Sequence, residues 1–570
     1  MEEDKQNVMM FFIISMLIMV GYLYFFDNNR TVEPTITRSN YEKTDVAAVS
    51  SPIAKVASPI QLTKVENITI ESKNLSGTIS SRGVKIDGIS LRKYKKSIND
   101  QGNVEVLRNS HPRYFAQTKW TSSDPQVVLP DENSCWKTSS NRLSEDSPVI
   151  LTWDNGNGLL FEKRISVDND FLVTIVDVVK NHGANDVSLA SVTVIDREFE
   201  ASDNSMNFYE GPLGYINGKL EEIKYEDIAK QREIHYQTQG GWFGVTDKYW
   251  LTAFIPNQKL NHSLVYRHSM DEGKNVYRIE SITDPVPIAP SVEISKTHHL
   301  FVGAKEIKTL DMYEEKLNVQ HFDLAIDFGC LYIITKPHLY ALAYTKDLVG
   351  NMGLGIILIT LLIKLFLLPL ANRSYSSMNR MSVVQPKIQE LRKKYEGDKV
   401  KLGQAISELY KKEGVNPVGG CLPVLLQSPI LFALYKVLYI SMEMRQAPFI
   451  WWIRDLSLPD PSTVLNLFGL VPVNLPGFLQ IGIWPLLMGA SMLLQQKMSP
   501  APTDPAQAKM MFIMPVMFTF MFAQLPSGLV IYWTFSNILG IAQQYIIKKL
   551  DDNRHSGEDN NGKRAKAPKS

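Results

Sequence analysis

Long apolar runs are confined to the two ends of this 570-residue chain, and this distribution limits the folds open to it. Runs long enough to cross a bilayer occur in the first 26 residues and in roughly the last 200, whereas residues 27–346 have the composition of an ordinary soluble domain. The sequence therefore predicts one soluble domain and one part that is embedded in lipid.

Six segments have the length and apolar character of membrane-spanning helices. They are residues 8–26, 348–370, 421–441, 478–496, 510–524 and 528–547. The first has no small-residue cleavage site before Asp27, so residues 1–27 are expected to remain as an N-terminal signal-anchor span. The prediction is a polytopic α-helical membrane protein with six spans, of which the last five form a core over residues 347–548.

The distribution of positive charge predicts the orientation of these spans, because Lys and Arg near span ends tend to stay cytoplasmic. The loop 371–420 carries ten Lys and Arg residues and the tail after Ile547 carries seven, whereas the loop 442–477 has only Arg445 and Arg454. Both termini, including the basic tail 549–570, are therefore predicted to be cytoplasmic. Residues 27–346 would lie on the outer face, which suggests the periplasm and a multi-pass protein of the bacterial inner membrane.

The soluble part is predicted to be a β-sandwich joined to the first span by a linker. Residues 28–65 are rich in Ser, Thr, Pro, Val and Ala without periodicity, which is typical of a flexible linker. Over residues 66–315, short β-branched and aromatic stretches alternate with Gly, Asn and Asp turns, as in strands. Trp242, Tyr249 and Trp250 could line a ligand groove, but packing in the core is the favoured interpretation.

Metal and cofactor chemistry find no support in the sequence. The three cysteines, Cys135, Cys330 and Cys421, are far apart and have no CxxC or Cys/His spacing, so neither a disulfide framework nor a metal site is indicated. A net charge of +1 points to no polyanionic partner such as a nucleic acid. The soluble domain also contains no catalytic constellation.

Two further helical segments flank the second span. Residues 320–346 include an apolar and aromatic stretch too short to span, which predicts an amphipathic helix in the outer interface, with a simple linker as the alternative. Apolar residues at three- and four-residue steps predict a cytoplasmic helical hairpin over residues 374–415. Its positive charge is either only a topology signal or a docking surface for a ribosome or other partner.

Lys364 is the most informative single residue, because it interrupts the apolar run 359–369. A lysine among lipid-facing residues costs roughly 2.5–3.5 kcal/mol, so it should be paired, hydrated or functional. Snorkelling towards the cytoplasmic interface is the simpler alternative. Within the six predicted spans there is no Asp or Glu to pair with it.

Other polar residues in the predicted spans could line a hydrated groove with Lys364. Thr360 lies one helical turn earlier on the same face. The remaining candidates are Gln427 and Ser428 in the third span and Ser536 and Asn537 in the last. With no acidic partner in the spans, the charge of Lys364 would be free to attract an acidic or polar segment of a visiting protein.

Three strings in the apolar region resemble the membrane core of the YidC/Oxa/Alb family of membrane insertases. They are residues 416–423 (NPVGGCLP), 445–449 (RQAPF) and 525–533 (LPSGLVIYW). The segment that begins at 240–244 (GGWFG) and ends at Ile255 and Pro256 similarly resembles the periplasmic β-domain of Gram-negative members. The resemblance covers nearly the whole chain.

This resemblance implies a hydrophilic, positively charged groove that is open to the cytoplasm and lipid and closed on the outer side. Lys364 falls where the family usually carries an arginine, so the charge is kept but the planar, multi-donor guanidinium is lost. Thr360 matches a groove residue beside it. The family's substrate-contacting slide would here include the following side chains: Ser428, Leu431, Phe518, Tyr532 and Trp533.

The function that the resemblance implies is insertion, folding and assembly of nascent integral membrane proteins, alone or with the Sec translocon, with ribosome contacts through the cytoplasmic loops and tail. A secondary transporter is the chief alternative, but the spans show no inverted repeat and no acidic coupling residue. A membrane enzyme lacks a nucleophile–base pair or phosphate loop. A purely structural scaffold would leave Lys364 unexplained.

Overall fold

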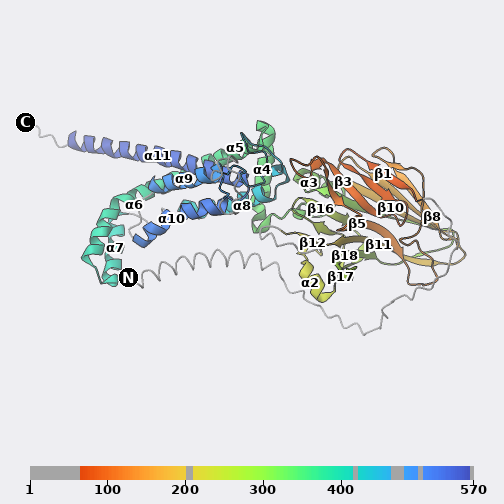
Figure 1. The fold of residues 1–570 in the computed structure, drawn as a ribbon. Coiled ribbons are helices and arrows are strands. Elements are labelled where there is room, and N and C mark those ends of the chain that lie inside the picture. The colour runs from red at the N-terminus through yellow and green to blue at the C-terminus, as the bar shows by residue number, and fades with distance from the viewer. Residues whose placement is uncertain (1–64, 200–208, 415–421, 464–479, 499–504, 565–570) are drawn as a thin grey trace, which may run out of the picture. The chain divides into compact units, whose positions relative to one another are not determined.

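The computed structural model describes residues 65–199, 209–414, 422–463, 480–498 and 505–564 (Figure 1). They form two compact units: a β unit that ends at Asp327 and a helical unit that begins at Phe328. The predicted N-terminal span and nearly all of the predicted linker lie outside the described residues.

The β unit contains two large sheets. The described strands of the first sheet pair in the order β14 (Glu233–Gln239), β17 (Asn261–Asp271), β18 (Lys274–Thr283), β11 (Val187–Glu198), β5 (Tyr114–Thr121), β3 (Ile86–Lys95), β2 (Leu75–Ser80), β1 (Asn67–Glu71), β7 (Arg142–Leu143), with β4 (Asn103–Leu107) beside β3 and β19 (Val286–Ile288) beside β11. The second follows the order β13 (Lys219–Glu222), β12 (Gly211–Ile216), β15 (Trp242–Thr246), β16 (Trp250–Ile255), β20 (Glu293–Ala304), β10 (Leu172–Asn181), β9 (Leu159–Val167), β8 (Val149–Asp154), β6 (Lys137–Thr138).

Alternating side chains explain why these segments pair into a sandwich. In β1, Ile68 and Ile70 are fully buried while the residues between and before them are exposed, the period-two pattern of a half-buried strand. The longer strands β9 and β10 pair antiparallel with Ile165 opposite Ile175. Trp242 is fully buried in β15, as the core interpretation predicted, whereas Tyr249 and Trp250 are half-buried. The predicted β-sandwich is therefore confirmed.

Three short helical segments among the described residues complete the β unit, one between β13 and β14 and two after β20. They are α2 (Tyr225–Gln231), α3 (Ile307–Lys316) and the 3-10 turn η1 (Phe322–Ala325). The buried Tyr313 of α3 donates a hydrogen bond from its hydroxyl to Asp168 Oδ2 at 2.7 Å and packs edge-to-face on Phe301. This side chain ties α3 to the second sheet.

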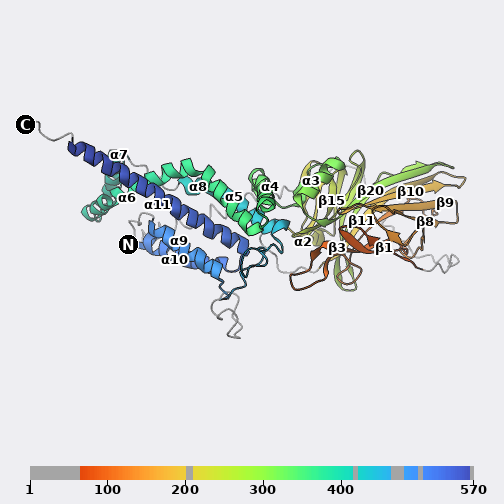
Figure 2. The same cartoon turned by 90° about the horizontal axis from the view of Figure 1, so that it is seen from above.

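The helical unit is built from long helices. In chain order the described helices are η2 (Gly329–Leu331), α4 (Tyr332–Val349), α5 (Met352–Phe366), α6 (Leu368–Lys394), α7 (Lys399–Glu413), α8 (Leu422–Ile440), η4 (Met442–Met444), α9 (Ile483–Met498), α10 (Pro505–Phe522) and α11 (Ser527–Arg564). Helix α11 runs beside α9 and also packs on α5, α9 packs on α10, and α4 packs on α5 and α8 (Figure 2).

Helices α6 and α7 form a hairpin whose contact is apolar. Val384 and Ile388 are buried there against Ile406, Leu409 and Tyr410. Three- and four-residue spacing places each set on one face of its helix, which is why the two helices pack on each other.

Among the described residues, no helix reaches the combination of length and hydropathy that crossing a membrane requires.

A loop of residues 442–463 closes one end of the helical unit by bonding to the starts of two helices. The carbonyls of Leu456 and Leu458 accept hydrogen bonds from the N–H groups of Gly528 at 3.0 Å and Ser527 at 2.7 Å, which begin α11. The Asp460 carboxylate accepts a hydrogen bond from the N–H of Trp484, in the first turn of α9, at 2.9 Å. These bonds satisfy N–H groups that a helix start otherwise leaves without a partner.

Candidate functional site

Lys364 lies in the last turn of α5, a helix that starts with a regular cap. The Asn351 side chain accepts a hydrogen bond from the N–H of Leu354 at 3.1 Å and so begins the helix. Thr360, one turn before Lys364, is only 2% exposed, and its hydroxyl donates to the carbonyl of Ile356 at 2.6 Å. The four-residue spacing places Lys364 on the same, inward-facing side of α5.

The Lys364 side chain is half-buried, while Leu361, Leu362 and Leu365 around it are exposed. In the part of the chain that the structure describes, no carboxylate lies within ion-pairing distance of its ammonium group. A partly desolvated cation without a counter-charge is unfavourable unless water or a bound anionic group compensates it. Among the described residues, Lys364 therefore carries a charge that the fold does not compensate.

Buried polar groups of α11 face two neighbouring helices. Ser536 and Asn537 are 8% and 7% exposed, and α11 packs on both α5 and α9. The Asn537 side-chain amide donates to Ser491 Oγ of α9 at 3.0 Å. The structure thus places Thr360, Ser536 and Asn537 on packed helices of one bundle, but none of the hydrogen bonds among the described residues links them to Lys364.

Ser491 is a polar contact that sequence reasoning missed. It is 8% exposed, and its hydroxyl also donates to the carbonyl of Met488 at 2.7 Å. The only signal in the sequence was one hydroxyl in the apolar run 478–496. Such a residue is ambiguous, because a serine in an apolar helix commonly bonds back to its own backbone.

Three of the predicted site residues lie on α8 and cannot be placed. Gln427, Ser428 and Leu431 belong to the helix Leu422–Ile440, but their side chains lie outside the described residues. The first of the family-like strings, residues 416–423, also falls almost wholly outside them.

The predicted slide residues of α10 and α11 meet through a third aromatic ring. Phe518 packs edge-to-face on Phe522 with ring centroids 5.9 Å apart, and Phe522 packs edge-to-face on Trp533 at 4.8 Å. Tyr532 is 3% exposed, whereas Phe518 and Trp533 are half-buried. Phe522 was missed, although its position four residues after Phe518 places it on the same face of α10.

The loop 442–463 also packs a large aromatic side chain onto α5. Phe449, the last residue of the string 445–449, is 6% exposed, and a Cβ on Gly353 would come within 2.0 Å of its ring. Its carbonyl accepts a hydrogen bond from the Asn351 side chain at 3.2 Å, and its ring packs near Trp484 at 5.8 Å. The end of the bundle at which α5, α9 and α11 begin is therefore filled by the loop.

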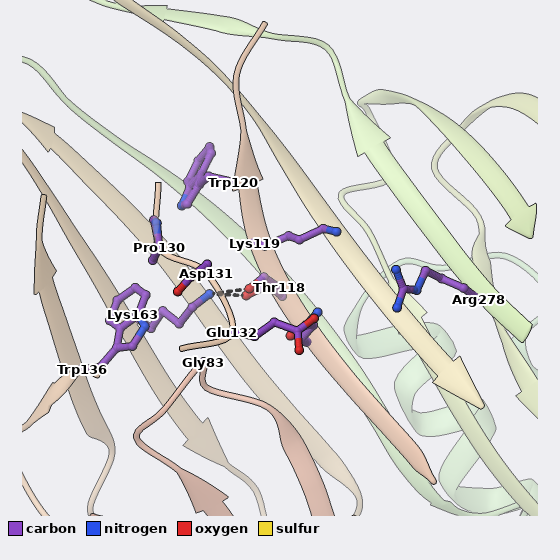
Figure 3. Close-up of a pocket in the computed structure, with 11 residues that line it drawn as sticks. Gly83, Thr118, Lys119, Trp120, Pro130, Asp131, Glu132, Trp136, Lys163 and Arg278 are labelled. Carbon is purple, nitrogen blue, oxygen red and sulfur yellow. Dashed lines mark hydrogen bonds between the residues drawn. The ribbon is translucent and has the colours of Figure 1, made fainter. Parts of the chain in front are cut away.

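The β unit has a cavity of its own, of about 150 Å³, shown in Figure 3. Its lining mixes two indoles with charged groups, namely Gly83, Gln117, Thr118, Lys119, Trp120, Pro130, Asp131, Glu132, Trp136, Lys163 and Arg278. The buried Lys163 ammonium has three short contacts, to the Thr118 carbonyl at 2.8 Å and to Thr118 Oγ1 and Asp177 Oδ1 at 2.6 Å. Its donors are therefore already used within the fold.

The ion pair of Lys163 and Asp177 continues into a buried histidine. His298 Nε2 lies 2.9 Å from Ser191 Oγ and 3.7 Å from Asp177 Oδ2. Burial disfavours the charged imidazolium and lowers the pKa of His298 to about 4, although the nearby Asp177 charge acts in the opposite direction. The histidine is therefore neutral at pH 7.

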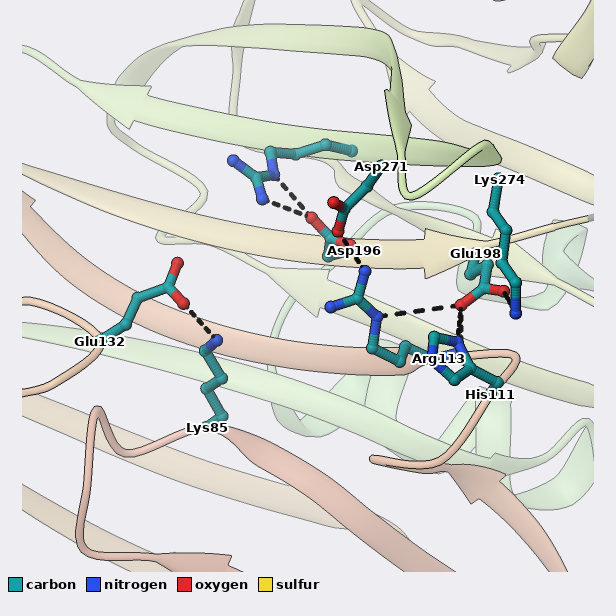
Figure 4. A network of polar contacts seen from close by, with 9 residues as sticks. Lys85, His111, Arg113, Glu132, Asp196, Glu198, Asp271 and Lys274 are labelled. Carbon is teal, nitrogen blue, oxygen red and sulfur yellow. Dashed lines mark hydrogen bonds and ion pairs between the residues drawn. The ribbon is translucent and has the colours of Figure 1, made fainter.

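A second polar network lies around the end of β11 (Figure 4). The Glu198 carboxylate lies 2.7 Å from His111 Nδ1, 2.9 Å from Lys274 Nζ and 3.8 Å from Arg113 Nε. Burial alone would raise the pKa of Glu198, but the bonds from His111, Lys274 and the Arg113 backbone lower it to about 2. The network keeps the Glu198 carboxylate ionised and surrounds it with positive groups, so its charge is compensated within the fold.

One cluster in the β unit has side chains that could bind a cation. The ligand atoms of Glu314, His321 and Asp323 lie within 4.8 Å of one another. Glu314 Oε2, however, accepts the backbone N–H of Phe322 at 3.0 Å and so already serves the turn that follows α3. This is a structural role for a carboxylate at a turn.

Comparisons with known proteins assign both units to one family. Residues 344–554 match the family described as 60Kd inner membrane protein, and residues 67–341 match the YidC periplasmic domain. The chain is 40% identical over 561 residues to proteins named membrane protein insertase YidC from Rickettsia felis and Rickettsia rickettsii, covering 97% of this chain and 100% of each relative.

Solved structures include a crystal structure described as active YidC insertase with the first transmembrane domain resolved. It is 17% identical, covers 85% of this chain and 94% of its own, and has a TM-score of 0.35. A galactose mutarotase related enzyme from Lactobacillus acidophilus is 14% identical, covers 41% of this chain and 97% of its own, and has a TM-score of 0.31. The name insertase describes a role other than catalysis, in agreement with the predicted lack of an enzyme site. From its two matching family domains and its 40% identity to these relatives over 97% of its length, the chain belongs to the YidC family of membrane protein insertases.

Proposed function

We propose that this chain inserts and folds nascent integral membrane proteins in the bacterial inner membrane, and that the half-buried, unpaired charge of Lys364 receives polar segments of the client. The observation that carries this proposal is the location of Lys364 on the inward face of α5 with no carboxylate near it in the described part of the chain. An anionic or polar client segment would supply the missing counter-charge.

A lipid environment for the helices is supported by their exposed apolar side chains. Phe366 of α5 is 83% exposed, Leu494 of α9 52%, Phe512 of α10 63% and Ile546 of α11 56%. Exposed large apolar side chains on four neighbouring helices are costly in water but favourable in hydrocarbon. With the N-terminal segment as the sixth span, helices α5, α8, α9, α10 and α11 would form the five-span core.

The depth of the polar groups fits a site halfway across a bilayer. Thr360 and Ser491 lie eight residues after the first residues of α5 and α9, and Asn537 ten residues after that of α11. At a rise of about 1.5 Å per residue these positions are ~12–15 Å from the end that the loop 442–463 closes. The hydrocarbon core is about 30 Å thick, so the polar groups lie near its middle.

This arrangement gives a physical route for insertion. A polar tail that crosses a bilayer loses its hydration, and burying its unpaired polar groups is the main barrier. Lys364, Thr360, Ser536 and Asn537, with Gln427, would hydrate and attract the tail partway into the membrane. The ring cluster of Phe518, Phe522 and Trp533, with Tyr532, Ser428 and Leu431, would let the client's apolar segment slide into lipid.

The charge distribution supports an orientation with both termini in the cytoplasm. The end of the bundle at which α5, α9 and α11 begin carries the loop 442–463, which has two Arg residues, whereas α6 and α7 at the other end belong to the Lys- and Arg-rich segment 371–420. The packed loop would close the groove on the outer face. The cytoplasmic hairpin and basic tail would be available to a ribosome, and the core to the Sec translocon.

The test is insertion of a small two-span client with an acidic periplasmic tail into vesicles that contain the purified protein. We expect Lys364→Ala and Lys364→Glu to insert at least about tenfold less client than the wild type, since about 1.4 kcal/mol of lost attraction changes a rate or equilibrium tenfold. Lys364→Arg should retain insertion because it keeps the charge. Lys497→Ala removes an exposed cation from the last turn of α9 and is the matched control.

Each result separates the alternatives. Equal insertion by all Lys364 variants would mean that this lysine only extends to the interface and carries no client. No insertion by the wild type above that of empty vesicles would reject the insertase function itself. Flux of a small solute through wild-type vesicles would instead support a transporter.

A further inference from the structure

One tight turn of the loop 442–463 exposes a large aromatic side chain. Residues 449–453, here called the Trp451 turn, are closed by a hydrogen bond from the N–H of Phe449 to the carbonyl of Ile453 at 3.0 Å. Trp451 at its tip is 75% exposed, and Ile450 beside it is 37% exposed. Trp451 has a φ of +58°, a left-handed conformation that is unfavourable for a bulky residue. The fold therefore holds an indole outward at a backbone cost.

The base of the Trp451 turn is fixed to the helical unit. Phe449 and Ile453 are 6% and 1% exposed. The neighbouring indole of Trp452 donates its N–H to Asp460 Oδ1 at 2.9 Å, and Asp460 in turn binds the first turn of α9. The rings of Trp451 and Trp452 stack with centroids 5.6 Å apart and planes 19° from parallel. The exposed indole therefore projects from a rigid base.

The residues around this tip combine apolar and positive groups. Leu458 is 54% exposed and Arg454 is exposed. On α9, Leu486 and Leu487 follow two and three residues after Trp484, whose N–H donates to Asp460, and are 41% and 45% exposed. The start of α9, to which the loop is bonded through Asp460, therefore also exposes apolar side chains. Indoles prefer the interface between hydrocarbon and headgroups, and an arginine there can bind lipid phosphates.

We propose that the Trp451 turn is an interfacial anchor that inserts the Trp451 indole among the lipid headgroups, with Arg454 against their phosphates. This inference rests on the proposed function, because it requires the helical unit to lie in a bilayer. The anchor would set the depth of the loop 442–463 and therefore of the starts of α9 and α11, to which the loop is bonded. A protein partner would need a much larger contact than one protruding ring and the five exposed residues named with it.

The experiment measures the depth of single spin labels on the full-length protein in vesicles of phosphatidylethanolamine and phosphatidylglycerol. The background carries Cys135→Ser, Cys330→Ser and Cys421→Ser, and one label is placed by Trp451→Cys. Two reference labels come from Leu365→Cys, whose parent side chain is 54% exposed on α5, and Val400→Cys, 72% exposed on α7. Collision with oxygen reports lipid, and collision with a water-soluble nickel chelate reports water.

We expect the label at 365 to collide mainly with oxygen, the label at 400 mainly with nickel, and the label at 451 to lie between them, at headgroup depth. If the label at 365 reports lipid but the label at 451 reports water as fully as the label at 400 does, the proposed anchor is wrong, whereas the proposal that the helices lie in the membrane is supported. If 365 also reports water, the proposed function fails first. Protection of 451 from both reagents would mean that a protein covers the turn and would overturn the proposal.

A second measurement keeps the natural cysteines. Lipids brominated close to the headgroup should quench the fluorescence of the wild type more than that of Trp451→Phe, whereas lipids brominated near the chain ends should quench both nearly equally. Equal quenching of the two proteins by the shallow lipids would contradict insertion of Trp451 at this depth.

Discussion

The two units treat buried charge in opposite ways. In the β unit, Lys163 and Asp177 are 4% and 0% exposed and lie 2.6 Å apart, and the buried Arg197 binds Asp247 at 2.7 Å. In the helical unit, the half-buried Lys364 has no such carboxylate among the residues that the structure describes. Charges that a fold pairs internally stabilise or specify that fold. A charge that it leaves unpaired is available to a visiting molecule.

Among the changes that test this contrast between the two units, removing the carboxylate partner of Lys163 should have the largest effect on stability. Asp177→Ala leaves the buried Lys163 ammonium without a counter-charge and with Thr118 as its hydrogen-bond partner, so we expect a loss of about 3–5 kcal/mol in the free energy of unfolding of the β unit. Urea unfolding of the full-length protein, followed by hydrogen exchange in β9 and β10, measures it. The exposed Asp186 gives the control Asp186→Ala, with an expected change within about 0.5 kcal/mol.

If Asp177→Ala unfolded at the same urea concentration as the wild type, the pair would not be a structural element and the contrast with Lys364 would disappear. The double variant Lys163→Met, Asp177→Leu removes both charges. It should recover most of the lost stability, because apolar side chains of similar volume often replace a buried pair without penalty.

Acid should weaken the β unit through His298. Its pKa in the fold is about 4, below the 6.5 expected after unfolding. Between these values only the unfolded chain binds the proton, so stability falls as the pH drops from about 6.5 to 4 and is not lost further below that. The full shift corresponds to about 3 kcal/mol. Unfolding of wild type and His298→Gln at a series of pH values tests this, and a parallel decline in both would assign the effect to other groups.

Removing the charge of Lys364 should not destabilise its unit, in contrast to disrupting the pair of Lys163 and Asp177. Lys364→Met removes a partly desolvated charge, so we expect the thermal stability of the helical unit to remain or to rise by about 1 kcal/mol, while insertion of an acidic-tailed client falls. Thermal unfolding in detergent and the vesicle assay on the same preparation give the two values. A variant that lost stability and insertion together would indicate that Lys364, like Lys163, serves the fold.

The smallest expected effect is at the contact between α9 and α11. The amide of Asn537 donates to Ser491, and both are buried. Asn537→Ala, Ser491→Ala and the double variant should give a coupling energy of about 0.6 kcal/mol, typical of interhelical hydrogen bonds in membranes. A coupling energy of zero would mean that Asn537 and Ser491 do not stabilise the packing of α9 on α11. They would then resemble Lys364, as polar groups that are available to the client.

Local sequence patterns predicted the strands, but not which strands that are far apart in the chain pair with each other. Short β-branched and aromatic stretches between Gly, Asn and Asp turns were enough to predict a β-sandwich. The parallel pairing of β1 with β7, where Ile70 lies opposite Leu143, depends on contacts far apart in the chain and has no local signature. The burial of Lys163 was also missed, because a charged residue in a strand normally faces water and only the position of Asp177 on the adjacent strand explains it.

For the candidate helical site, the position of Lys364 and Thr360 on one helix face could be predicted, because a spacing of four residues is a property of a single helix. The contacts of Ser491 and Phe522 could not be predicted, since they depend on the side chains that these residues meet on α11. The rotation of one helix against another decides such contacts, and packing sets this rotation.

The bonds between the loop 442–463 and α11 have a consequence for the order in which the protein is made. In the described part of the chain, the carbonyls of Leu456 and Leu458 accept their hydrogen bonds from Gly528 and Ser527, about seventy residues later in the sequence. During synthesis, water must supply the hydrogen bonds of these carbonyls until α11 has left the ribosome. The loop 442–463 can therefore reach its final hydrogen-bonded structure only after α11 has been synthesised, although the loop itself is translated much earlier.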